Sequence, residues 1–358
     1  MYCHDPMCLT SETAVLVTSA KMRHCDLLVL GDGSIVVTFG TSDPSTAEAS
    51  KLLVFHAFSA TNWTTVTVAR SPIPFGVNET SGMPTGGLGM PALIDGVMSP
   101  RQPPPLVPSV HVAYWDVIGK RLILLANVLS KTPSTVVVAE GYQRNSSDAA
   151  SNPGAWVQMA RRPDSSIFDV VFFDLTEGAM MGATCNDEIT STNDVTRRTD
   201  TGTVTGSSSS SSSSTTSSTT SCTVPAKLDA VGHRDISDFG AGAFPSFRAG
   251  EGFARMVYFS QEAEETGAPQ GGRWGSTVEV GSLKLLECAA SACTGDDVST
   301  LSKGKAGFGR DASWATTTTT RDGGDSSSGN EVMLVSFLDL HGVDSLDSMR
   351  AMLAVYTR

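Results

Sequence analysis

Short apolar runs with an aromatic residue near their end recur along the chain, and polar turns separate them. Gly, Asp, Ser and Pro flank each run, which is typical of short β-strands. The five runs are Ile35–Phe39, Val112–Asp116, Val170–Asp174, Met256–Phe259 and Leu334–Asp339. Their last aromatic residues lie 76, 58, 86 and 78 residues apart, so the chain repeats one unit with insertions of different length.

A second apolar strand follows each of these runs, and a third, more β-branched strand follows in four units. The second strands are expected at Lys51–Phe58, Arg121–Val128, Ala179–Cys185, Leu283–Cys288 and Met352–Tyr356. The third strands are expected at Thr64–Ala69, Thr135–Ala139, Asn193–Arg197 and Asp297–Leu301. First strands, such as Cys25–Leu30 and Phe244–Arg248, precede the aromatic runs. Four short strands per unit predict a radially repeated all-β fold.

The two ends of the sequence carry complementary parts of this unit. The fifth unit stops at Arg358 before a last strand, and Glu12–Thr18 is a strand without partners of its own. We therefore predict one domain over residues 1–358, a five-bladed β-propeller-like fold with four antiparallel strands per blade. The N-terminal strand would close the last blade and cover its edge. The alternative is a fragment of a longer repeat array, cut within a blade at both ends.

Three polar segments interrupt the repeat. Residues 199–221 are rich in Ser and Thr, cannot bury apolar surface and are predicted to be disordered. Residues 71–109, which include Pro103-Pro104-Pro105, and residues 316–329 are predicted to form irregular loops. The repeat resumes after each segment, so none of them is interpreted as a domain boundary.

Seven cysteines are present, and two pairs share a spacing of four intervening residues. These pairs are Cys3 with Cys8 and Cys288 with Cys293. The spacing alone does not exclude zinc, but no His follows at the spacing of a second zinc knuckle. A local disulfide that braces a hairpin turn is the better interpretation. Three cysteines, Cys25, Cys185 and Cys222, stay unassigned, and the odd total leaves at least one thiol free or paired outside the chain.

Three N-x-[ST] sequons, at Asn62, Asn78 and Asn145, fall in predicted loops or turns. Together with the cysteine pairs they predict an extracellular or secretory-pathway protein. The N-terminus shows no basic segment followed by an apolar one, so no signal peptide is visible, and a truncated N-terminus would explain this.

Charge and hydropathy narrow the set of partners. The formal net charge is −12, which argues against nucleic acid and anionic membrane surfaces as partners. No apolar run approaches the length of a membrane span. The sequence does not indicate an oligomeric state.

Two parts of the chain carry a family resemblance. Leu283, Lys284, Cys288 and Cys293 match an L-K-V-x-x-C-x4-C element, and Asp32-Gly33 with the following valines matches part of a D-G-x-P-V-x-x-Y-Y-D element. Both elements resemble a repeat found in β-propeller proteins of bacteria and microalgae. The resemblance is clearest in the last third and the first 40 residues. It implies a propeller, but no established activity and no functional residues.

The candidate catalytic residues are three acids near strand ends, Asp116, Asp174 and Asp339. In a propeller they would lie at similar radius, and two carboxyls that face the channel could flank a glycosidic bond. Residues that form turns between strands are the simpler interpretation. The six His residues form no metal or catalytic motif. Two acidic clusters, Asp296-Asp297 and Asp322–Asp325, could bind Ca²⁺ but lack an alternating ligand ladder, so we expect neither a metal nor a cofactor.

The favoured function is therefore a non-catalytic extracellular binding or scaffold module, with a glycan or protein ligand held on the propeller loops. The chain is interpreted as a non-enzyme rather than an enzyme. The first alternative is a glycoside hydrolase that uses carboxylates facing the channel. The second is a fragment of a longer repeat protein without independent function.

Overall fold

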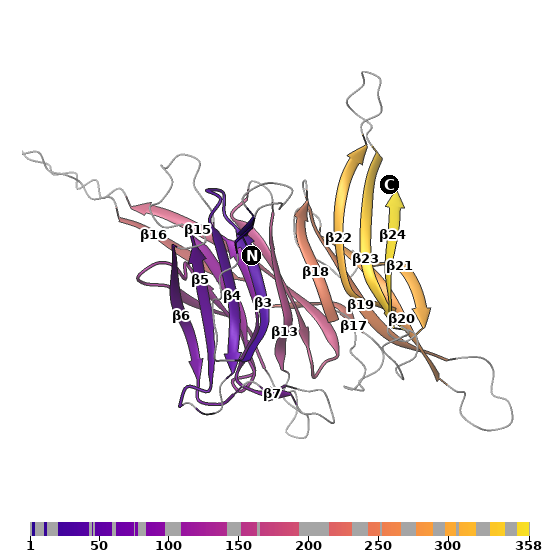
Figure 1. Ribbon diagram of the computed structural model, residues 1–358, viewed down its shortest axis with the longest axis horizontal. Coiled ribbons are helices and arrows are strands. Elements are labelled where there is room, and N and C mark those ends of the chain that lie inside the picture. Colours follow the sequence, from indigo (N-terminus) through magenta and orange to yellow (C-terminus); the bar gives the residue numbers. More distant parts are fainter. Residues whose placement is uncertain are drawn as a thin grey trace, which may run out of the picture.

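Figure 1 shows a computed structural model of the protein, in which the described part of the chain consists of antiparallel strands and turns and contains no helix. The structure describes residues 2–3, 11–12, 21–42, 45, 47–58, 62–74, 76–77, 84–96, 109–141, 152–162, 165–192, 215–230, 243–250, 253–265, 277–288, 298–305, 308–319, 330–340 and 349–357. Five sheets follow one another along the chain, and we number them one to five.

The first two sheets have four strands each, hydrogen-bonded in sequence order. Sheet one contains β3 (Lys21–Val29), β4 (Ile35–Ser42), β5 (Ser50–Ala57) and β6 (Trp63–Ser71). Sheet two contains β9 (Leu88–Asp95), β10 (Val110–Asp116), β11 (Arg121–Ala126) and β12 (Ser134–Glu140). Two short ribbons, β1–β2 (Tyr2–Cys3 and Ser11–Glu12) and β7–β8 (Gly76–Val77 and Pro84–Gly86), precede sheets one and two.

The other three sheets vary this plan. Sheet three contains β13 (Pro153–Arg161), β14 (Ile167–Asp174), β15 (Ala179–Thr192), β16 (Thr215–Cys222) and β17 (Ala226–Ala230), and both β16 and β17 pair with the long β15. Sheet four contains β18 (Ala243–Gly250), β19 (Phe253–Glu265), β20 (Thr277–Cys288) and β21 (Val298–Lys305). Sheet five contains β22 (Phe308–Thr319), β23 (Asn330–Leu340) and β24 (Met349–Thr357).

Each sheet packs against the next, and the first strands of successive sheets meet. Contacts join β3 to β9, β9 to β13, β13 to β18, and β18 to β22. In Figure 1 the sheets fan out, with β3 and β22 toward the middle of the molecule and β6 and β24 toward its two sides. This arrangement is propeller-like. Of the predicted closing strand, only Glu12 is described, so the predicted pairing with Met352–Tyr356 stays a prediction.

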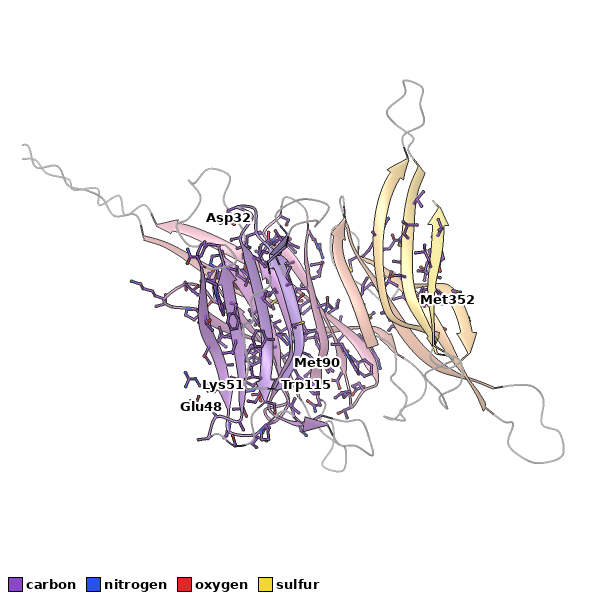
Figure 2. All side chains as sticks on the ribbon, viewed as in Figure 1. Asp32, Glu48, Lys51, Met90, Trp115 and Met352 are labelled. Carbon is purple, nitrogen blue, oxygen red and sulfur yellow. A yellow bond between two sulfur atoms is a disulfide. The ribbon has the colours of Figure 1, made fainter. Side chains whose placement is uncertain are left out.

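The middle sheets bury both faces, which explains why their strands read as apolar runs. In sheet two, Val112 and Tyr114 belong to the core shared with sheet one, while Ala113 between them belongs to the core shared with sheet three. Successive side chains of a strand point to opposite faces, so a sheet between two neighbours needs apolar residues at every position. Figure 2 shows Met90 and Trp115 near each other, in a further buried cluster between these sheets.

The five aromatic runs lie in β4, β10, β14, β19 and β23, as the pattern predicts, and all five second strands are present. One predicted third strand, Asn193–Arg197, lies outside the described residues. A strand that the sequence did not predict, Ala226–Ala230, pairs with Ala179–Gly182 in sheet three.

The structure also corrects the bounds of all three polar segments. Strand β16 begins at Thr215, inside the segment predicted to be disordered, because its β-branched threonines extend the β15 ladder. Strand β9, the first strand of sheet two, lies inside residues 71–109, where the surrounding Pro and Gly hid a buried strand. Strand β22 continues to Thr319, so residues 316–319, which were predicted to belong to a loop, are part of a strand. Among the described residues, no helix is long and apolar enough to cross a membrane.

Candidate functional site

A groove of about 390 Å³ lies between the outer part of sheet two and sheet three. One wall is the last strand of sheet two, β12, from Val137 to Glu140. The opposite wall comes from sheet three, from strands β13, β14, β15 and β16 and from the segment between β16 and β17. Its lining residues there are Pro153, Phe172, Asp174, Met181, Cys222, Thr223, Val224 and Pro225. The lining residues are mostly apolar, and they include two acids, Glu140 and Asp174.

Asp174 is the sequence-predicted acid that the structure places in a groove. It ends β14 and is 3% exposed. Its Oδ1 accepts hydrogen bonds from the backbone N–H groups of Asn152 (3.3 Å), Thr176 (3.0 Å) and Glu177 (3.1 Å), so the carboxyl also holds the β14–β15 turn. Burial raises the pKa of Asp174, and the three hydrogen bonds lower it. The effect of burial is larger, so the pKa is raised above its ordinary value. A buried acid with a raised pKa retains its proton to higher pH than a solvated one.

Glu140 supplies the second carboxyl from the end of β12. Its backbone pairs with Arg121 on β11, and its negative charge adds to the larger effect of Asp116, whose hydrogen bond and charge raise the pKa of that guanidinium. The side chain is exposed, in contrast to Asp174. The groove thus places one buried acid and one exposed acid against a shared apolar wall. Sequence reasoning missed Glu140 because nothing in a single strand-ending Glu distinguishes it from a solvated residue.

Asp116 holds the equivalent turn of sheet two, and the groove lining does not include it. Its Oδ1 accepts a hydrogen bond from the Gly119 N–H (3.0 Å), and its Oδ2 accepts one from Arg121 Nη2 (2.9 Å). Both side chains of this ion pair are partly exposed, at 18% and 39%. Asp116 is therefore a turn residue, which matches the simpler interpretation.

Asp339 lies one residue farther from the aromatic residue of its run than the other two acids do. Asp116 and Asp174 directly follow the aromatic residue of their run, whereas Asp339 follows Phe337 by two residues. Asp339 pairs with Arg350 on β24, but its side chain is not among those described, so the predicted equivalence of the three carboxyls stays a prediction.

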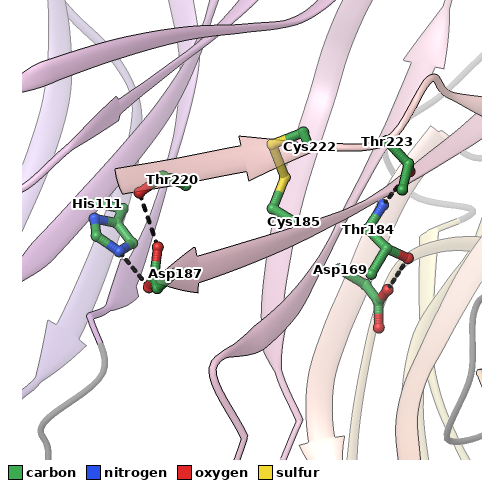
Figure 3. Close-up of a disulfide and its surroundings, with 8 residues drawn as sticks. All are labelled: His111, Asp169, Thr184, Cys185, Asp187, Thr220, Cys222 and Thr223. Atoms are coloured by element: carbon green, nitrogen blue, oxygen red, sulfur yellow. Dashed lines mark hydrogen bonds and ion pairs between the residues drawn. A yellow bond between two sulfur atoms is a disulfide. The ribbon is translucent and has the colours of Figure 1, made fainter. Parts of the chain in front are cut away.

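A buried polar network next to the groove joins sheet two to sheet three (Figure 3). His111 Nδ1 accepts a hydrogen bond from the Asn127 N–H (3.0 Å), so its proton is on Nε2, which donates to Asp187 Oδ2 (2.8 Å). Arg161 Nη2 donates to the same oxygen (2.9 Å), and Thr220 donates to Oδ1 (2.9 Å). Burial raises the pKa of Asp187, but the hydrogen bonds from His111 and Arg161 and the charge of Arg161 together lower it below its ordinary value.

A disulfide between Cys185 and Cys222 fixes the groove wall formed by residues 222–225 (Figure 3). Cys185 pairs with Phe168, five residues before Phe173, and Cys288 pairs with Ala254, five residues before Phe259, so the two cysteines hold the same position in their sheets. The long Ser/Thr segment lies between Cys185 and its partner, which is 37 residues away in the chain. The sequence left both cysteines unassigned, and the structure pairs them with each other.

The other predicted cysteines are only partly described. Cys288 is in a disulfide, but Cys8 and Cys293 lie outside the described residues, so the predicted pairs Cys3–Cys8 and Cys288–Cys293 stay predictions. Cys25, left unassigned by the sequence, is free and exposed.

Of the predicted glycosylation sites, Asn62 is exposed in the turn between β5 and β6. Asn78 and Asn145 lie outside the described residues, as do both acidic clusters considered for Ca²⁺. Within the described ranges, no group of three or more His, Cys, Asp or Glu side chains could hold a metal ion.

No protein-family model matches the chain, and no curated protein matches it. Solved structures of an α-L-arabinofuranosidase from Fusarium graminearum are similar to it. A mutant of that enzyme in complex with an iminosugar inhibitor has a TM-score of 0.41 and 11% identity, and covers 94% of this chain and 76% of its own. The complex with arabinobiose has a TM-score of 0.39 and 10% identity, and covers 92% of this chain and 80% of its own.

Proposed function

We propose that this protein is an extracellular glycan-binding module, and that its ligand occupies the groove between sheets two and three. The observation that carries the proposal is the groove itself, in which an apolar wall lies beside the carboxyl groups of Asp174 and Glu140. Its volume of about 390 Å³ is in the lower part of the range of small-ligand pockets, which is large enough for one or two sugar rings.

The chemistry of the lining favours a saccharide over a purely apolar ligand. Carboxylate oxygens accept hydrogen bonds, and sugar hydroxyls donate them, so Glu140 at the exposed side can orient a bound ring. The C–H face of a sugar can pack against Val137, Val138 and Val224, of which Val224 is 89% exposed without ligand. An extracellular location is supported by the Cys185–Cys222 disulfide and by the exposed sequon at Asn62.

Replacing Asp174 by Asn is expected to weaken glycan binding by about tenfold to a hundredfold, because a hydrogen bond to a charged or acidic group is lost. Asn preserves an oxygen that can accept the three backbone N–H bonds, so the turn survives. A glycan array identifies the ligand, and titration calorimetry with that glycan measures the affinity of the wild type and the variant.

The matched control is Asp116→Asn, which changes the equivalent turn residue of sheet two outside the groove and should leave affinity unchanged. Equal losses in both variants would show that the turns, not the groove, affect binding. A wild-type protein that binds no glycan but captures a protein ligand through the groove would contradict the saccharide assignment.

A second candidate function is a glycoside hydrolase, and the raised pKa of Asp174 favours it. A glycosidase pairs a protonated general acid with a second carboxylate, and Asp174 and Glu140 share one groove. Asp174 would protonate the leaving oxygen, and Glu140 would act on the sugar or on a water molecule.

If the groove is catalytic, turnover of a nitrophenyl glycoside should fall by a factor of about 10² to 10⁴ in Asp174→Asn and be unaffected in Asp116→Asn. Because the acid must carry its proton, turnover should decline as pH rises through the raised pKa of Asp174. A panel of nitrophenyl glycosides provides the measurement. If the protein binds a glycan but hydrolyses no glycoside of the panel, the binding module is the supported function.

A further inference from the structure

The groove between sheets two and three is acidic, because its described lining residues include two acids and no Lys, Arg or His. The acids are Glu140, which is exposed, and Asp174, which is buried. Two basic side chains of the same sheets are paired with acids outside the lining: Arg121 with Asp116, and Lys227 with Glu177. The lining therefore offers negative charge without a positive partner.

One carboxylate oxygen of Asp174 accepts no hydrogen bond from the described residues. Oδ1 accepts all three backbone bonds that hold the β14–β15 turn, which leaves Oδ2 to the groove that this side chain lines. Burial, and to a smaller extent the charge of Glu177, raise the pKa of the carboxyl. A buried carboxylate without a positive partner is unfavourable, so a ligand that supplies a positive charge is bound more strongly here than at an exposed acid.

The equivalent place between sheets three and four contains an ammonium group of the chain itself. In sheet three, Phe172 directly precedes the last aromatic residue of its run and pairs with Met181, which lines the groove. In sheet four, Tyr258 has the same place and pairs with the buried Lys284. Lys284 Nζ and the Tyr258 hydroxyl both donate to Asp229 Oδ2, at 2.9 and 2.7 Å. A largely buried carboxylate is thus neutralised there from the position of Met181.

We propose, on the basis of the glycan-binding function proposed above, that the ligand of the groove is a glycan with free amino groups, whose protonated amine pairs with Asp174 Oδ2. The amine would supply the positive charge that Lys284 supplies in the next interface, and Glu140 would attract further amines at the exposed side. An N-acetylated sugar lacks this charge, and both acids would repel the carboxylate of a uronic acid.

The experiment compares sugars that differ only in the amine. Native full-length protein is titrated calorimetrically with disaccharides of glucosamine and of galactosamine, each as the free amine and as the N-acetylated form. At about pH 6 the amines carry their protons. We expect at least one free-amine disaccharide to bind about tenfold to a hundredfold more tightly than its N-acetylated form, because it makes a charge-assisted hydrogen bond. Added salt should reduce this preference.

Two variants with matched controls locate the amine. Asp174→Asn should reduce the preference for the free amine by about tenfold or more, whereas Asp116→Asn should preserve it. Met181→Lys introduces the ammonium found in the next interface and should also remove the preference, whereas Met181→Gln, of similar length but uncharged, should retain it. The ratio of the two affinities is informative because general damage to the groove lowers both. Far-UV circular dichroism and an intact Cys185–Cys222 bond verify that each variant is folded.

The outcomes for the ligand class and for the proposed function are distinguishable. N-acetylated disaccharides that bind as tightly as the free amines, or an array on which only neutral or acidic glycans bind, would overturn the inference and leave a glycan-binding module. A protein that binds no glycan at all would reject the proposed function itself. A preference for the amine that survives in both Asp174→Asn and Met181→Lys would place the amine elsewhere and overturn its assignment to this groove.

Discussion

Replacing Asp187 by Asn is expected to lower the free energy of unfolding by about 3 kcal/mol at pH 7. The Asp187 carboxylate is 6% exposed and neutralises Arg161, whose side chain is 14% exposed. Without that negative charge, the guanidinium would retain the backbone oxygens of Asp95, Ser165 and Ser166 and a longer ion pair, at 3.7 Å, with the exposed carboxylate of Asp95. Removing one partner of a largely buried pair leaves a poorly solvated charge, which costs more than the pair contributes. Urea unfolding followed by tryptophan fluorescence measures the difference.

The pH dependence of this loss has a definite sign. The pKa of Asp187 is lowered in the folded protein, so its stabilising effect is fully present above the unfolded-state pKa of about 4 and is lost as pH falls through the folded-state value. The gap between wild type and Asp187→Asn should therefore narrow in acid. The control is Asp116→Asn, which removes a partly exposed ion pair and should cost about 1 kcal/mol or less. Equal losses for both variants, or a gap that widens in acid, would contradict this account.

The same network of hydrogen bonds and ion pairs also fixes the position of sheet two relative to sheet three. His111 comes from β10, Arg161 from β13, Asp187 from β15 and Thr220 from β16, so four strands of two sheets meet at one carboxylate. The ring of His111 lies 5.7 Å from that of Phe168, and the Arg161 guanidinium lies 5.1 Å from the same ring. Groups placed in this way restrict sliding of one sheet over the other.

The sequence predicted most strands because packing on both sides leaves a strong local pattern. Val170–Asp174 is buried at every position, and a continuous apolar run bounded by turn residues is recognisable without knowledge of its partners. The turn role of Asp116 and Asp174 could also be inferred, because an Asp side chain that forms a turn accepts hydrogen bonds from backbone N–H groups close to it in sequence. The favoured turn interpretation of these two acids is confirmed by their hydrogen bonds.

Features that depend on contacts distant in sequence escaped prediction. Pairing Cys185 with Cys222 requires knowing that β15 and β16 form a long hairpin across a Ser/Thr segment that carries no apolar pattern. The groove escaped prediction as well, because its walls come from β12 and from residues 222–225, which meet only after sheets two and three pack.

Removing the disulfide by the double substitution Cys185→Ala and Cys222→Ala is expected to cost about 3 to 4 kcal/mol of unfolding free energy. The bond closes a loop with a sequence separation of 37, so the reduced unfolded chain gains considerable freedom. The loss should also affect the groove, because Cys222, Thr223, Val224 and Pro225 form part of its wall. Glycan affinity should therefore fall at temperatures where the variant is still folded.

Calorimetric melting measures the loss of stability, and binding titration measures the loss of affinity. The control is Cys25→Ser, since replacing an exposed free thiol should change stability by about 0.5 kcal/mol or less. A double variant that melts like the wild type would show that the paired hydrogen bonds between Thr184 and Thr223 alone fix this wall.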